Sequence, residues 1–147
     1  MGGTSFKLDW GGLDRALGSA VGKAARTKPV LEEIGEALVS STVERFSSST
    51  APDGTPWEPS QRAEREGGKT LVDSGRLRSS IGYEASSAHV AVGSNVEYAR
   101  IHQLGGKAGR NHSVTLPARP YLGFSDEDIE EARAILRGHL AAILGGK

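Results

Sequence analysis

The amino-acid sequence predicts an α+β fold, in which a small antiparallel β-sheet packs with a long helix from the first half of the chain and with a C-terminal helix. Two apolar stripes with helical spacing, over residues 29–46 and 125–144, predict the helices. β-Favouring residues between these stripes, above all residues 89–93, predict the sheet. The chain has 147 residues, enough for one modest hydrophobic core, so we expect a single domain over residues 1–147.

The N-terminal segment carries two weaker patterns. Phe6, Leu8 and Trp10 alternate with other residues, which fits a short strand, an extended arm over residues 1–12 or a frayed terminus. Apolar residues then recur at helical spacing over residues 13–25, which indicates a weak helix.

The helix over residues 29–46 has the clearest signals in the first half. Pro29 suits a first helical turn, and Glu32 and Glu33 follow in the early turns, where the helix dipole favours carboxylates. Gly35 lowers helix stability by about 1 kcal/mol relative to alanine. We therefore expect tertiary packing to hold this helix.

A loop containing a tryptophan follows the long helix. Asp53 and Gly54 predict a turn, and Trp57 comes shortly after it. A tryptophan on such a loop anchors either the core or an interface, and the core is the more common place. Residues 60–66 are rich in charge and are predicted to form a solvated helical turn or a disordered loop.

The middle of the chain contains the strand signals. Asp73 or Ser74 is expected to cap a short helix that runs to Ile81. Three segments after it have strand propensity, two joined by a polar turn and a third further on: residues 82–86, 89–93 and 114–116.

A short helix and a basic loop come next. Helical turns over residues 98–103 would place Tyr98 and Ile101 on one face, with Arg100 and Gln103 pointing away. The loop that follows, residues 105–113, is rich in glycine and basic residues, including Lys107, Arg110 and His112. It cannot bury enough apolar surface to order itself, so we expect a mobile loop between fixed ends.

A proline-rich segment fixes the far end of this loop. Pro117 and Pro120 stiffen the backbone, and Tyr121 follows directly. Arg119 lies between Ala118 and Pro120, so its guanidinium group can be aimed at a carboxylate, within the chain or across a subunit boundary.

The last helix begins with a recognisable cap. Ser125 is the expected N-cap, and Asp128 stands three residues later, as in a capping box with aspartate in place of glutamate. Apolar residues at helical spacing then continue towards the C-terminus.

No set of residues predicts catalysis or metal binding. His102 is the obvious candidate for a general base, but the nearby acid, Glu97, is five residues away, a poor spacing for contact on a helix. We expect His102 to bond to backbone at a helix end. The chain has no cysteine and no His/Asp/Glu metal motif, so we expect no metal, no cofactor and no enzymatic activity.

Charge and hydropathy narrow the classes of partner. The 18 basic and 18 acidic residues give a net charge of zero, which argues against a dedicated nucleic-acid binder. No apolar run approaches the length of a membrane span, so we expect no membrane partner. A cluster of basic residues could contact phosphates, or form a solvated arm that meets acidic protein surfaces: Arg100, Lys107, Arg110, His112 and Arg119.

Four pieces of sequence, taken in order, resemble the phage virion morphogenesis family, the Mu-like tail completion proteins of tailed bacteriophages. The first three are Arg45-Phe46, Asp53-Gly54-Thr55-Pro56-Trp57 and Leu71-Val72-Asp73-Ser74-Gly75-Arg76-Leu77. The fourth runs from Tyr98-Ala99-Arg100-Ile101-His102-Gln103-Leu104-Gly105 to Leu116-Pro117-Ala118-Arg119-Pro120-Tyr121-Leu122-Gly123. The resemblance covers residues 32–128, with Leu104 where an aromatic residue is expected.

The resemblance implies the same α+β architecture and a structural, non-enzymatic protein of the phage neck. Such proteins form a ring, with a hexamer as the expected size, at the head-proximal end of the tail and enable head–tail joining. The implied partners are further copies, connector or neck proteins, and tail tube or tail terminator proteins, in the virion and in the host cytoplasm during assembly. The motif and interface candidates are Trp57, Tyr98, Arg100, His102, Gln103, Lys107, Arg110, Arg119 and Tyr121.

Other functions stay open at this point. Within the same class, the chain could be a tail terminator or a head-side connector protein. Outside it, the alternatives are a small hydrolase that uses His102 and a nucleic-acid module whose basic loop touches DNA in a channel.

Overall fold

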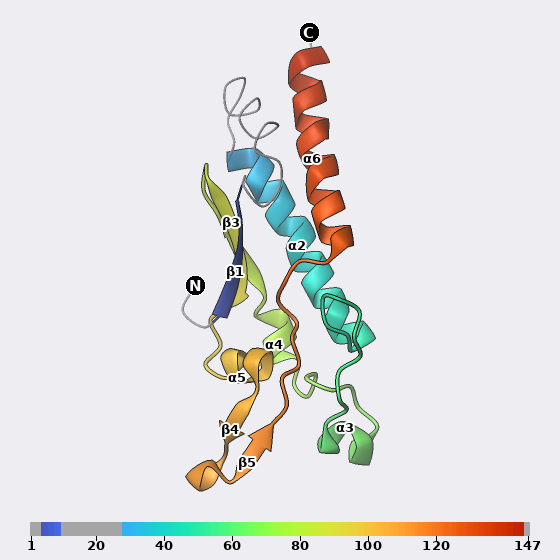
Figure 1. Ribbon diagram of the computed structural model, residues 1–147, viewed down its shortest axis with the longest axis vertical. Helices are drawn as coiled ribbons and strands as arrows, with labels where there is room; N and C mark the ends of the chain where they lie inside the picture. The colour runs from blue at the N-terminus through green and yellow to red at the C-terminus, as the bar shows by residue number, and fades with distance from the viewer. Residues whose placement is uncertain (1–3, 10–27, 146–147) are drawn as a thin grey trace.

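The computed structural model describes residues 4–9 and 28–145 and shows an elongated α+β molecule (Figure 1). The elements follow in the order β1 (Thr4–Asp9), α2 (Lys28–Ser48), α3 (Gln61–Glu66), α4 (Arg76–Ser79), β2 (Gly82–Ala85), β3 (His89–Ser94), α5 (Ala99–Leu104), β4 (Gly106–Ala108), a 3₁₀ turn η1 (Arg110–His112), β5 (Val114–Leu116) and α6 (Asp126–Gly145). None of the described helices is both long and apolar enough to cross a membrane.

A three-stranded antiparallel sheet, in the order β1-β3-β2, covers one side of α2. The central strand β3 carries Val90 and Val92 into the core, where both are almost fully buried. Strand β1 pairs with β3 from Thr4 opposite Ser94 to Asp9 opposite His89. Of the readings for the N-terminal segment, the strand is therefore confirmed for residues 4–9, whereas Trp10 and the helix predicted over 13–25 lie outside the described residues.

The two predicted long helices are confirmed and pack against each other. The apolar stripe of α2 is buried beneath the sheet and α6, with Val30, Leu31, Ile34, Leu38 and Phe46 at most 3% exposed. The predicted capping box of α6 also forms. The Asp128 amide donates to Ser125 Oγ at 3.0 Å, and the Ser125 amide donates to Asp128 Oδ2 at 3.0 Å.

Gly35 allows the sheet to approach α2 closely. A Cβ atom at this position would lie 2.5 Å from Cδ2 of Tyr83 on strand β2. Such a distance is well inside van der Waals contact, so the tyrosine ring occupies the place of a side chain here. The packing that the sequence required for this helix is therefore supplied by Tyr83.

Two shorter helices differ in how well they match expectation. Ser60 caps α3, its Oγ accepting from the Ala63 amide at 3.1 Å, which confirms the helical turn predicted there. Helix α4 is shorter than predicted, because it ends at Ser79 and its N-cap is Gly75. Ser74, one residue before this N-cap, accepts a 3.3 Å hydrogen bond at its Oγ from the Arg76 amide.

The third strand candidate forms a separate hairpin. Strand β5 pairs with β4 in a two-stranded sheet, and β1 takes the third place in the main sheet. The segment predicted to be an irregular loop is therefore largely this β4–β5 hairpin (residues 106–116), which ends in the η1 turn. Backbone pairing supplies the order that apolar burial could not supply. The mobility of this segment stays a prediction.

Candidate assembly site

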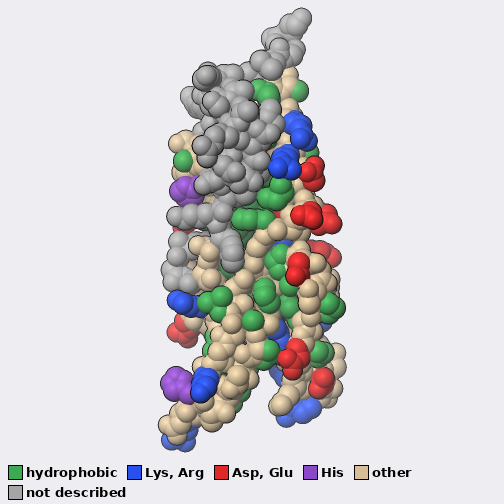
Figure 2. All heavy atoms as spheres, in the orientation of Figure 1, with side chains coloured by type: hydrophobic (Ala, Val, Ile, Leu, Met, Phe, Trp, Pro, Cys, Tyr) green, Lys and Arg blue, Asp and Glu red, His purple; other side chains and the backbone are tan. Residues whose placement is uncertain are grey.

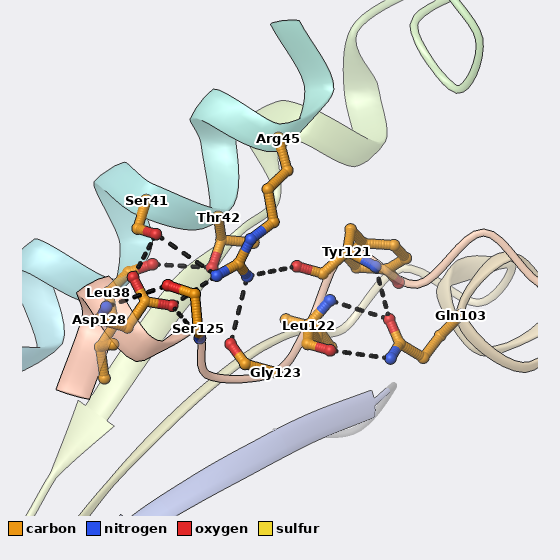
Figure 3. A network of polar contacts seen from close by, with 10 residues as sticks. All are labelled: Leu38, Ser41, Thr42, Arg45, Gln103, Tyr121, Leu122, Gly123, Ser125 and Asp128. Carbon is orange, nitrogen blue, oxygen red and sulfur yellow. Dashed lines mark hydrogen bonds and ion pairs between the residues drawn. The ribbon is translucent and has the colours of Figure 1, made fainter. Parts of the chain in front are cut away.

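A buried polar network joins α2, α5 and α6 to the irregular segment 117–125 (Figure 3). Gln103 on α5 is 5% exposed and binds that segment three times. Its Nε2 donates to the Leu122 carbonyl at 3.0 Å, and its Oε1 accepts from the amides of Tyr121 and Leu122 at 3.0 and 2.9 Å. The prediction that Gln103 points away is wrong, because segment 117–125 packs on the side of α5 that looked free in sequence.

Arg45 occupies the other half of the network, at the last turn of α2. Its Nη1 donates to the carbonyls of Tyr121 and Gly123 at 2.8 and 3.2 Å, and its Nη2 forms a buried ion pair with Asp128. Asp128 also accepts from the Ser41 hydroxyl and caps α6. One guanidinium group therefore fixes where segment 117–125 and helix α6 lie against α2.

Aromatic residues fill the space beneath this network. Phe46 contacts Trp57 edge-on, with ring centroids 5.7 Å apart, and Tyr121 at 5.3 Å. The Trp57 indole donates to the Pro120 carbonyl at 2.8 Å, and the Tyr121 hydroxyl donates to the Ala99 carbonyl at 2.6 Å. Burial raises the pKa of Tyr121, so its hydroxyl keeps the proton it donates. In this chain Trp57 and Tyr121 are core residues.

Arg119 is buried, and its guanidinium group binds a backbone carbonyl. Its Nε donates to the Glu58 carbonyl at 2.6 Å, and its amide donates to the His102 carbonyl at 2.8 Å. The described residues place no carboxylate of this chain within ion-pair distance of this guanidinium, and a carboxylate across a subunit boundary stays a prediction. Arg119 thus ties the proline-rich segment to both α5 and the loop before α3.

His102 lies in a cleft of about 470 Å³, beside Arg119 and with its ring centroid 5.9 Å from that of Tyr98. Its buried Nδ1 has no hydrogen-bond partner among the described residues, so the predicted bond to backbone does not form at this atom. Burial, and secondarily the Arg119 cation, lowers the pKa of His102 and keeps the ring neutral. The described part of the chain places no carboxylate against this ring to orient it, which a general base of the usual kind needs. Tyr98 itself is half-buried, with the Arg76 guanidinium 5.6 Å from its ring centroid.

The β4–β5 hairpin presents basic and apolar side chains to solvent. Lys107, Arg110 and His112 are exposed on it, and Val114 is 49% exposed. Leu104, just before the hairpin, is 58% exposed, and Arg100 on α5 is exposed as well. Figure 2 shows Lys, Arg and His side chains at this end of the molecule.

Gly105 sets the direction in which the hairpin leaves α5. Its φ angle is +73°, and a Cβ atom there would lie 2.7 Å from the Ala118 amide nitrogen. Both features exclude a side chain, so the hairpin starts in close contact with the segment that the polar network holds.

A second, larger cleft lies where α2 ends and α6 begins. Its volume is about 790 Å³. Four exposed acidic residues line it: Glu44, Asp53, Asp126 and Glu127. Five apolar residues also line it: Ala51, Pro52, Pro120, Leu122 and Phe124. The Arg45 guanidinium in its wall is already neutralised by Asp128, so the cleft is strongly acidic.

Within residues 4–9 and 28–145, no three His, Asp or Glu side chains are grouped to hold a metal ion.

The polar network had one signal in the sequence. Arg45 falls at helical spacing on the apolar stripe of α2, seven residues after Leu38, where a cation needs a buried partner.

Comparisons with known proteins place the chain in a family. The sequence model of the phage virion morphogenesis family matches residues 8–141. Mu-like prophage FluMu G protein 2 of Haemophilus influenzae is 34% identical over 116 residues, covering 79% of this chain and 80% of that protein. Tail completion protein S of Escherichia phage P2 is 31% identical over 122 residues, covering 74% of this chain and 80% of that protein. Protein G of Escherichia phage Mu is 31% identical over 134 residues, covering 84% of this chain and 86% of that protein.

No solved structure matches the chain. The family match spans nearly all of the described fold, from strand β1 to helix α6, and includes the four sequence pieces that carry the resemblance. This chain therefore belongs to the phage virion morphogenesis family.

Proposed function

We propose that this chain is a structural tail completion protein. Copies of it assemble as a hexameric ring at the head-proximal end of the phage tail, and the ring enables head–tail joining. Family membership and the name of the phage P2 relative support this role. Its partners would be connector or neck proteins on the head side and tail tube or terminator proteins on the tail side, in the virion neck and, during assembly, in the host cytoplasm.

The observation that carries the proposal is what the family motif residues do. Arg45, Gln103 and Tyr121 are buried, and each bonds to backbone that lies far away in sequence. These side chains hold segment 117–125 in place, and the described part of the chain places no carboxylate against His102 to orient it. A protein whose motifs maintain shape acts through its surfaces, so we propose no enzymatic activity.

A genetic test addresses this role directly. The gene is inactivated in the phage or prophage that carries it, and the chain is supplied from a plasmid. We expect separate heads and tails by electron microscopy without the chain, joined virions with it, and the chain at the head-proximal end of purified tails. Normal yields of joined virions without the chain would overturn the proposal.

A second candidate role is contact with the DNA that passes through the ring. The exposed cations Lys107 and Arg110 support it, because such side chains bind phosphates without sequence preference. The neutral net charge weakens this role as a primary function.

A further inference from the structure

We propose that the β4–β5 hairpin of one copy docks into the acidic cleft between α2 and α6 of the next copy. Each copy would then contact its two neighbours through two different surfaces. The inference rests on the proposed function, since it names the surfaces by which the ring would form. It concerns residues that neither the family match nor the names of the relatives assign to any contact.

The hairpin has the form of an inserting element. It projects from the end of the molecule away from the C-terminus (Figure 1). Among the described residues, neither Lys107 nor Arg110 has an acidic partner in its own chain. The exposed Val114 adds apolar surface beside these cations. A partner for this element needs carboxylates around an apolar floor.

The acidic cleft has this composition. In the described part of the chain, Glu44, Asp126 and Glu127 have no cation paired with them. Asp53 accepts hydrogen bonds from neighbouring groups, among them the Thr55 amide at 2.9 Å, and has no paired cation there either. Ala51 and Pro52 contribute apolar surface between these carboxylates. The cleft therefore offers uncompensated negative charge where the hairpin offers uncompensated positive charge.

The walls of the cleft are held before any partner arrives. Arg45 binds the carbonyls of Tyr121 and Gly123 and pairs with Asp128, so α2, segment 117–125 and α6 keep their places. A preformed receptor loses little conformational freedom on binding, which favours association.

The arrangement of the two surfaces favours a second copy as the occupant. The hairpin and the cleft belong to different elements, because the cleft is lined by the end of α2, the start of α6 and the segments beside them. The hairpin lies at one end of the elongated molecule, away from the start of α6 (Figure 1). A contact between two different surfaces of identical chains is heterologous, and such contacts build closed rings when the rotation between copies closes. DNA would use the hairpin alone and would be repelled by the cleft.

Charge reversal tests the pairing in the complementation system. The hairpin variant is Lys107→Glu/Arg110→Glu, and the cleft variant is Glu44→Lys/Glu127→Lys. We expect each to lower the yield of joined virions at least about tenfold, and the combined variant to recover most of that loss, since the charges again attract. The controls are Arg137→Glu on the exposed face of α6 and Glu64→Lys, which reverses another first-turn carboxylate; both should keep wild-type yields.

Disulfide trapping tests the same contact in the particle. The chain has no cysteine, so an engineered pair is the only source of a disulfide between copies. Ser113→Cys lies beside the hairpin tip and Ser48→Cys on the cleft wall; both serines are exposed. On oxidation of purified tails, the double variant should give a ladder of covalent multimers, and each single variant should give none longer than a dimer.

Three outcomes overturn the inference. Normal joining by both reversal variants, without a ladder, would mean that the copies associate through other surfaces while the proposed function stands. Loss of joining by the hairpin variant alone, unrescued by the cleft reversal, would assign the hairpin to DNA or another protein. Failure of the wild-type chain to complement would overturn the proposed function itself.

Discussion

At the scale of single residues, the Arg45–Asp128 ion pair holds helix α6 against α2, and Arg45 also binds the backbone of segment 117–125. Replacing Arg45 with alanine leaves the Asp128 carboxylate buried without its cation and removes a donor from the Tyr121 carbonyl. We expect Arg45→Ala to lower the free energy of unfolding by about 3–5 kcal/mol, the usual effect of breaking a buried ion pair. Urea denaturation measures this, with Arg137→Ala as an exposed control. A loss below about 1 kcal/mol would show that the pair contributes no more than a surface salt bridge.

His102 gives a prediction with a defined sign. Its pKa in the folded protein lies below its ordinary value of about 6.5, because burial and the Arg119 cation oppose protonation. Below that value the unfolded chain takes up a proton that the folded chain resists, so stability falls as the pH drops. We expect His102→Gln to flatten the decrease in melting temperature between about pH 6.5 and pH 5. An NMR titration that places the His102 pKa above 6.5 would contradict this prediction.

For single residues, the sequence predicted the burial of a side chain better than its hydrogen-bond partners. Trp57 was predicted as an anchor in the core or at an interface, and in this chain it is buried. Gln103 was placed on the wrong face, because its position depends on segment 117–125, which no local pattern locates. The partner of Arg119 was also missed, since a backbone carbonyl from the loop before α3 has no sequence signature.

At the scale of elements, Gly35 is a position where the helix propensity of α2 and its packing against strand β2 favour different residues. Helix propensity alone predicts that Gly35→Ala stabilises α2 by about 1 kcal/mol. The Tyr83 ring, however, occupies the place of the new methyl group, 2.5 Å from it. We expect Gly35→Ala to destabilise the protein by about 1–3 kcal/mol through overpacking.

A double variant separates the two effects. In a Tyr83→Ala background the steric clash is absent, so Gly35→Ala should there be neutral or stabilising. Equal losses in both backgrounds, measured by urea denaturation, would show that Tyr83 is not the cause.

The sequence predicted the elements whose buried residues recur at a regular spacing. It did not predict the hairpin, whose order comes from backbone pairing between two short strands. Both long helices follow from apolar stripes, and the cap of α6 follows from Ser125 and Asp128. The β4–β5 hairpin has no such stripe, since its strands are three residues each and mostly exposed. It starts where Gly105 lies in close contact with the proline-rich segment, a tertiary feature that no local pattern predicts.

At the scale of the whole molecule, the packed core and the β4–β5 hairpin differ in the contacts that stabilise them. Buried side chains fix α2, α5, α6 and segment 117–125 against one another, whereas the hairpin is held mainly by its own short backbone ladder. Short, exposed ladders open at low free energy, so their amides exchange quickly. Recognition by such an element combines weak order in the free protein with firm order in the complex.

The last prediction therefore concerns the hairpin before and after assembly. We expect amides of residues 106–116 to exchange rapidly in the free chain and to become protected in purified tails, because docking buries the ladder against the acidic cleft. Amides in the middle of α2 should stay protected in both states and serve as the internal control. Assembly should also weaken as salt rises, since the contact pairs exposed charges. Equal exchange of the hairpin in both states, with assembly indifferent to salt, would leave the hairpin as a connector and the ring to other surfaces.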